Sequence, residues 1–152
     1  MELLAGLDLI THDVVRTALD DGDPRVRRLA VARSEPFLES SPELRACVAA
    51  RAEDPDPRVR FQTALSLGTV AAEGEIDRIA GIAVHGADDP WTQRAVLLVN
   101  RPNRPRLLQL IADQIGGEAS LPEPLLGTVV ELAKLIGQSG SDAECVAVVD
   151  LL

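Results

Sequence analysis

The stretch Asp56-Pro57-Arg58-Val59-Arg60 decides the fold, because the same five residues stand 33 positions earlier as Asp23-Pro24-Arg25-Val26-Arg27. A degraded copy, Asp89-Pro90-Trp91, follows 33 positions later. Self-similarity at a fixed period between about 20 and 50 residues is typical of solenoids made of stacked repeats. The sequence therefore predicts a repeat architecture.

Each copy of this phrase predicts the start of a helix. The Asp side chain can accept hydrogen bonds from the first free backbone N–H groups, and Pro suits the first helical position, where no donor is needed. The following Val would point into the core, while the arginines cover the helix flank or reach an Asp of a neighbouring repeat. The structural residues of the motif are Asp23, Pro24, Val26, Arg27, Asp56, Pro57, Val59, Arg60, Asp89 and Pro90.

Helical spacing of apolar residues continues through the rest of the chain, and no segment alternates with hairpin turns. We therefore expect an all-α fold, an α-solenoid of about four to five helical hairpins in a right-handed superhelical stack. The segment Ser34-Glu35-Pro36 predicts that the helix starting at Pro24 breaks or kinks there. A later helix, introduced by Ser120 and Glu123, is expected to carry the apolar residues Leu125, Leu126, Val129, Val130, Ala133 and Ile136.

Composition argues against several classes of function. The 152 residues carry a net charge of −9, which disfavours binding to nucleic acid or to an anionic membrane surface. One Trp and two Phe leave few platforms for base stacking. Cys47 and Cys145 belong to no CxxC pair, so no zinc or dithiol redox site is predicted, and no apolar run reaches the ~20 residues of a membrane span. We predict no cofactor and no metal.

The Asp-Pro-x-Val-Arg phrase resembles the start of the second helix in HEAT repeats, and the resemblance covers nearly the whole chain. It implies one HEAT-repeat domain over residues 1–152. Residues 54–68 and 88–97 are more specifically similar to the HEAT segment of large exported bacterial membrane-bound dehydrogenases. In that family a sugar-dehydrogenase-like propeller precedes the repeats, and a cytochrome c domain with a CxxCH haem motif follows them.

Neither flanking domain occurs in these residues. The resemblance therefore implies a connecting module cut from a larger redox protein, whose chemistry does not pass to the module. It also implies an exported or periplasmic location, whereas without it the sequence would suit the cytoplasm. Apolar residues near both ends favour end-to-end self-association, because terminal repeats need a polar outer face: Leu3, Leu4, Leu7, Val146, Val149 and Leu152.

The candidate partner-binding residues follow the starts of the repeat helices, on the expected concave side: Arg25, Arg28, Arg58, Trp91 and Arg94. An anionic peptide or phosphate could bind the arginines, and an exposed Trp91 could anchor a protein partner. The interpretation that we favour for the arginines pairs their guanidinium groups with the acidic turns. Trp91 could equally lie half-buried over the next helix. Arg25 and Arg58, next to their prolines, are expected to remain free of such pairs.

The acidic turns and the histidines give weaker signals. Calcium could bind within a turn, but adjacent stacked helices lie about 8–10 Å apart, so capping explains the aspartates better. His12 and His85 have no nucleophile beside them in any recognisable motif. The acidic residues concerned are Asp20, Asp21, Asp23, Glu53, Asp54, Asp56, Asp88 and Asp89.

Three functions remain, and a non-catalytic scaffold or protein–protein interaction module is the first choice. Its partner would be another protein or the flanking domains of the parent chain. The alternative is a HEAT-like protein of the bilin lyase type, which would need a pocket and a pigment. A nucleic-acid-binding helical repeat is third, because of the negative charge and the few aromatic residues.

Overall fold

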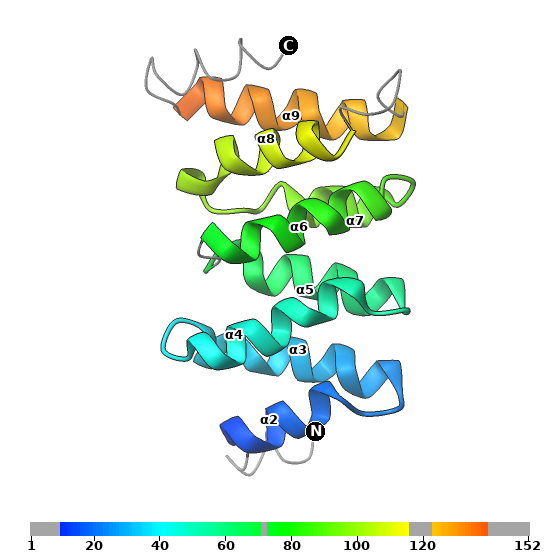
Figure 1. Ribbon diagram of the computed structural model, residues 1–152, viewed down its shortest axis with the longest axis vertical. Helices are drawn as coiled ribbons and strands as arrows, with labels where there is room; N and C mark the ends of the chain where they lie inside the picture. The colour runs from blue at the N-terminus through cyan, green and yellow to red at the C-terminus, as the bar shows by residue number, and fades with distance from the viewer. Residues whose placement is uncertain (1–9, 71–72, 116–122, 140–152) are drawn as a thin grey trace.

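A computed structural model gives the structure of the protein and describes residues 10–70, 73–115 and 123–139. Over these residues the chain is 82% helix, without strands, and contains eight α-helices. The prediction of an all-α fold is therefore confirmed. Figure 1 shows the helices stacked along the long axis, with α2 (His12–Leu19) at one end and α9 (Glu123–Ser139) at the other.

The helices form two rows. One row contains α2, α4 (Pro42–Ala49), α6 (Glu73–His85) and α8 (Arg104–Ile115), each in contact with the next. The other row contains α3 (Pro24–Leu38), α5 (Pro57–Gly68), α7 (Pro90–Val96) and α9, again in succession. Apart from α7 and α8, consecutive helices of the chain pack across the two rows. Short 3₁₀ segments, η1 (Ala50–Glu53) and η2 (Arg101–Asn103), follow α4 and precede α8.

The repeated phrase starts α3, α5 and α7 in the way its residues predict. Asp23 and Asp56 each accept a hydrogen bond at 2.8 Å from the backbone N–H two residues later, and Asp89 accepts from Trp91 and Thr92. A proline occupies the first turn of all three helices. The three copies therefore place residues with the same position in the phrase at the same position of successive helices.

Of the break or kink expected at Pro36, the break is wrong, because α3 continues through this proline to Leu38. Pro36 has no N–H for the carbonyl oxygen of Ala32, which is a cost to the helix. The last turn is held by packing instead, since Leu38 is fully buried and Phe37 lies against the core. Tertiary burial outweighs the local breaking signal.

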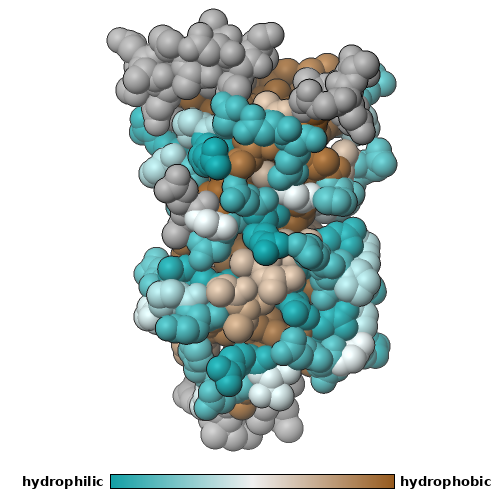
Figure 2. Space-filling view, in the orientation of Figure 1, coloured by the Kyte–Doolittle hydropathy of each residue, from teal (hydrophilic) through white to brown (hydrophobic). Residues whose placement is uncertain are grey.

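The core lies between the two rows and consists mainly of Leu, Ile, Val and Ala. In α9 the buried residues are Leu125, Val129, Leu132 and Ile136, on one helical face. Leu126 and Val130, two other apolar residues expected in this helix, are 47% and 41% exposed. Figure 2 shows mainly hydrophilic side chains on the face in view, with a paler, mildly apolar area over α4.

Other expectations fall partly or wholly outside the described residues. These include the terminal apolar residues thought to favour self-association, together with Ser120 and Cys145. Cys47 is half-buried and packs against the core. In the described part of the chain, no helix combines the length and the apolar character needed to cross a membrane.

Candidate functional site

The candidate site is a surface at the starts of α3, α5 and α7, here named the helix-start surface. It consists of Arg25, Arg28, Arg58, Trp91 and Arg94, all exposed. Arg25, Arg58 and Trp91 hold the same position in three successive helices of one row. The hydrogen bond to Asp23 raises the pKa of Arg25, and the positive charge of Arg58 opposes this increase.

Arg25 and Arg58 are paired, so the expectation that they remain free is wrong. Arg25 Nη2 lies 2.6 Å from Asp23 Oδ2, and Arg58 Nη2 lies 2.8 Å from Asp56 Oδ2. These hydrogen bonds lower the pKa of both aspartates to about 2. The two arginine side chains are nevertheless 79% and 68% exposed. The starts of α3 and α5 thus each present an exposed arginine that is paired with the capping aspartate of the same helix.

Trp91 is the largest apolar side chain on this surface. It is 66% exposed, so the half-buried alternative is wrong. The guanidinium carbon of Arg94 lies 5.5 Å from the centroid of the Trp91 ring, which is within the range of a cation–π contact. Arg94 therefore orders the indole without covering most of it.

Arg28 has no ion pair or hydrogen bond with any residue that the structure describes, and its side chain is exposed. Sequence analysis did not predict that three apolar residues, located after α7 and in α9, would be exposed: Leu98, Leu126 and Val130. Between α7 and α9 lies a shallow hollow of about 390 Å³, lined by residues that include Pro90, Arg94, Leu97 and Pro124. Helical periodicity predicts apolar residues along α9, but the packing of α9 against its neighbours determines which of them are exposed.

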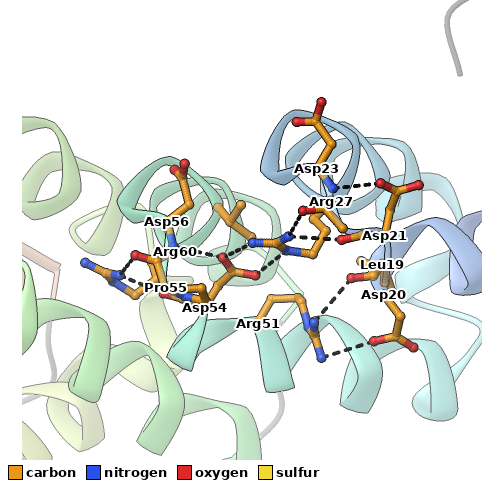
Figure 3. Close-up of polar contacts among 12 residues, drawn as sticks. Leu19, Asp20, Asp21, Asp23, Arg27, Arg51, Asp54, Pro55, Asp56 and Arg60 are labelled. Atoms are coloured by element: carbon orange, nitrogen blue, oxygen red, sulfur yellow. Dashed lines mark hydrogen bonds and ion pairs between the residues drawn. The ribbon is translucent and has the colours of Figure 1, made fainter.

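Arg27 does not belong to this surface, because it bridges two turns. Its Nε and Nη2 donate to the two carboxylate oxygens of Asp54, each at 2.7 Å, and its Nη1 donates to the carbonyl oxygens of Asp21 and Gly22 (Figure 3). The Asp54 side chain is 1% exposed. Burial acts to raise the pKa of Asp54, but the bonds from Arg27 and from the Asp56 N–H outweigh it, and the pKa is lowered. The predicted pairing between repeats is thus confirmed at Arg27.

The residues that correspond to Arg27 in the next two helices are Arg60 and Gln93. Arg60 Nη1 donates to the carbonyl oxygens of Asp54 and Pro55. Gln93 Nε2 donates to those of Ala83 and Gly86, and its side-chain oxygen accepts from Thr128 of α9. All three side chains therefore tie down the turn before their own helix, although Arg27 alone among them has a carboxylate partner in the described residues.

The two histidines lie in different settings. His12 Nε2 lies 2.7 Å from Ser41 Oγ, a contact that no sequence motif predicted. Ser41 is largely buried, and its hydroxyl oxygen accepts from the Leu44 N–H as the cap of α4, so the contact with His12 links α2 to α4. His85 is exposed, and its Nδ1 lies 2.8 Å from the Gly81 carbonyl oxygen.

Among the described residues, no group of three or more His, Cys, Asp or Glu side chains is arranged to hold a metal ion. The acidic turns instead cap helices and pair with arginines, as the contacts of Asp23, Asp54 and Asp56 show. No protein-family model, curated protein or solved structure matches the chain.

Proposed function

We propose that the protein is a non-catalytic helical-repeat module of the HEAT type, an α-solenoid that binds a protein partner through the helix-start surface. The exposed Trp91 carries this proposal. A Trp that remains 66% exposed leaves a large apolar ring in water, and a partner that covers it gains the free energy of its burial. Trp and Arg are the residues that most often dominate the energy of protein interfaces.

The arrangement of the surface supports the same function. The repeat places Arg25, Arg58 and Trp91 in a row, so a bound segment would meet two guanidinium groups and then an indole. Arg94 stacks on the indole and restricts it before binding, which lowers the entropy lost on association. Leu98, Leu126 and Val130 are further exposed apolar residues, located after α7 and in α9.

In a larger redox protein, such a module would link or position neighbouring domains. The supports for this wider role are the period of 33 residues and the resemblance of residues 54–68 and 88–97 to repeat segments of that kind. The partner would then be a flanking domain of the same protein or a separate chain bound at the same surface.

Affinity capture with the wild-type module, followed by measurement of Kd for the captured protein, tests the proposal. We expect Trp91→Ala to weaken binding at least about tenfold, because an interface anchor of this kind contributes more than 1.4 kcal/mol. Arg106→Ala is the matched control, since Arg106 is an exposed arginine on α8 in the other row. Equal affinity of the wild type and Trp91→Ala, with helicity unchanged in both, would contradict the proposal.

A further inference from the structure

The contacts of Arg27 define what an arginine at this place in the repeat can bind. Its Nη1 donates to carbonyl oxygens of the turn that precedes α3. Its Nε and Nη2 donate to the carboxylate of Asp54, which lies 27 residues later in the turn that precedes α5. Two parallel N–H···O bonds to one carboxylate are the geometry in which a guanidinium binds most specifically.

Arg60 repeats only half of this arrangement. Its Nη1 holds the carbonyl oxygens of Asp54 and Pro55, but its Nε and Nη2 make no hydrogen bond with a described residue. The residue 27 positions after Arg60 is Ala87, which has no carboxylate. The turns before α5 and α7 also differ in their hydrogen bonds. Before α7 the Asp89 N–H donates to the Gly86 carbonyl oxygen, whereas before α5 the Asp56 N–H donates to the Asp54 side chain.

A hollow of about 350 Å³ lies at Arg60, and His85, Ala52, Glu53 and Pro55 help to line it. Figure 3 shows the Arg60 guanidinium extending past the Asp54–Pro55 turn on the side away from Arg27. His85 also lines the hollow, and its Nδ1–H donates to the Gly81 carbonyl oxygen at 2.8 Å, which fixes the orientation of the ring. Open space therefore adjoins the guanidinium group of Arg60.

Both carboxylates that line the hollow, Glu53 and Asp54, have arginine partners other than Arg60. Asp54 is engaged by Arg27, and Glu53 is engaged by Arg78. The guanidinium of Arg60 is thus a local positive charge in a chain whose net charge is −9. A carboxylate is the group that the corresponding arginine, Arg27, binds in this same protein.

We propose that Arg60, with His85 lining the same hollow, forms a carboxylate-binding site between the turn before α5 and the turn before α7, where a ligand supplies the group that Ala87 lacks. The ligand is a carboxylate, either free or carried by an aspartate or glutamate side chain of a bound peptide. This site is separate from the helix-start surface and does not depend on the function proposed above.

NMR titration of the full chain tests the site, with the Nε–Hε signal of Arg60 and the ring signals of His85 as readouts. The probes are acetate, the peptide acetyl-Gly-Asp-Gly-amide and its neutral Asn analogue. We expect saturable shifts with a carboxylate probe and none with the Asn peptide. Saturation by acetate as well as by the Asp peptide would identify a site for free carboxylates, and saturation by the Asp peptide alone would identify one for acidic side chains.

Two lysine variants give the matched comparison, with the His85 ring signals as the shared readout. Arg60→Lys keeps the charge and removes the planar fork, so the affinity should fall at least about tenfold. Arg58→Lys changes an arginine on the same helix that does not line the hollow, and should bind as the wild type does. Shifts that stay linear with every probe, or equal affinity in Arg60→Lys and the wild type, would overturn the proposal.

Discussion

The carboxylate of Asp54 is 1% exposed, and Arg27, at 11%, is the residue that neutralises it. Removing one member of a buried ion pair leaves a charge in a poorly solvated place, which usually costs about 3 to 5 kcal/mol of folding free energy. We therefore predict that Arg27→Ala lowers the free energy of unfolding by about 3 kcal/mol or more, measured by urea denaturation.

Arg28→Ala is the control for Arg27→Ala, since it removes the neighbouring arginine, which is exposed. Its effect should lie within about 0.5 kcal/mol of zero, as for most surface substitutions. Similar losses in the two variants would show that the contacts of Arg27 do not have the special weight assigned to them.

The exposed cap pairs predict how stability depends on pH. Asp23 and Asp56 have a pKa of about 2 in the folded protein, below the ~3.9 of an unfolded Asp. Their contribution is therefore fully present above about pH 4 and is lost as the pH falls towards 2. The double variant Asp23→Asn, Asp56→Asn keeps residues that cap helices but removes these titrations. Urea unfolding between pH 4 and 2 should show a shallower slope for the variant, and identical slopes would refute this origin.

At single residues, sequence reasoning succeeds where one geometry dominates. An Asp before a Pro has one structural use at a helix start, and Asp23, Asp56 and Asp89 all follow it. The arginines were harder, because Arg25 and Arg58 can turn back to their own caps, a contact that depends on rotamers. The sequence also did not predict that Nε and Nη2 of Arg60 lack a partner among the described residues, because this depends on the hydrogen bonds of the turn before α7.

Among the elements, α9 offers the clearest test of packing. Leu132 is fully buried, whereas Leu126 on the same helix is 47% exposed. Leu132→Ala should lower the free energy of unfolding by about 2 to 5 kcal/mol through lost burial and the cavity left behind. Leu126→Ala should change it by less than about 0.5 kcal/mol. Equal losses in calorimetry or urea denaturation would mean that α9 presents a different face to the core.

Element boundaries show what local patterns miss. Pro36 predicts a break or kink in α3, yet the helix continues to Leu38, because burial of Leu38 stabilises its last turn. In α9 the run of apolar residues fits two overlapping helical stripes, and contact with α7 and α8 selects the one containing Leu125 and Leu132. Both outcomes depend on tertiary contacts, which the local sequence does not contain.

For the whole molecule, the period of 33 residues was enough to predict helices in series, since equal spacing of helix starts implies equal structural units. The row of helices α3, α5 and α7 then brings residues 33 apart to neighbouring positions. The sequence did not reveal that the indole of Trp91 remains outside, because an aromatic side chain at a helix start can fold over its neighbour or stand free. The exposure of Leu98 and Val130 likewise depends on how the last helices pack.

Photo-crosslinking at position 91 is the most direct test of the claim that the helix-start surface binds a protein. A benzophenone-bearing phenylalanine in place of Trp91 keeps an aromatic ring there, and the same residue at Arg106 on α8 gives the control. In extract of the source cell, we predict that one protein is crosslinked from position 91 and not from position 106. No crosslinked protein at position 91, or the same set of proteins from both positions, would contradict the account.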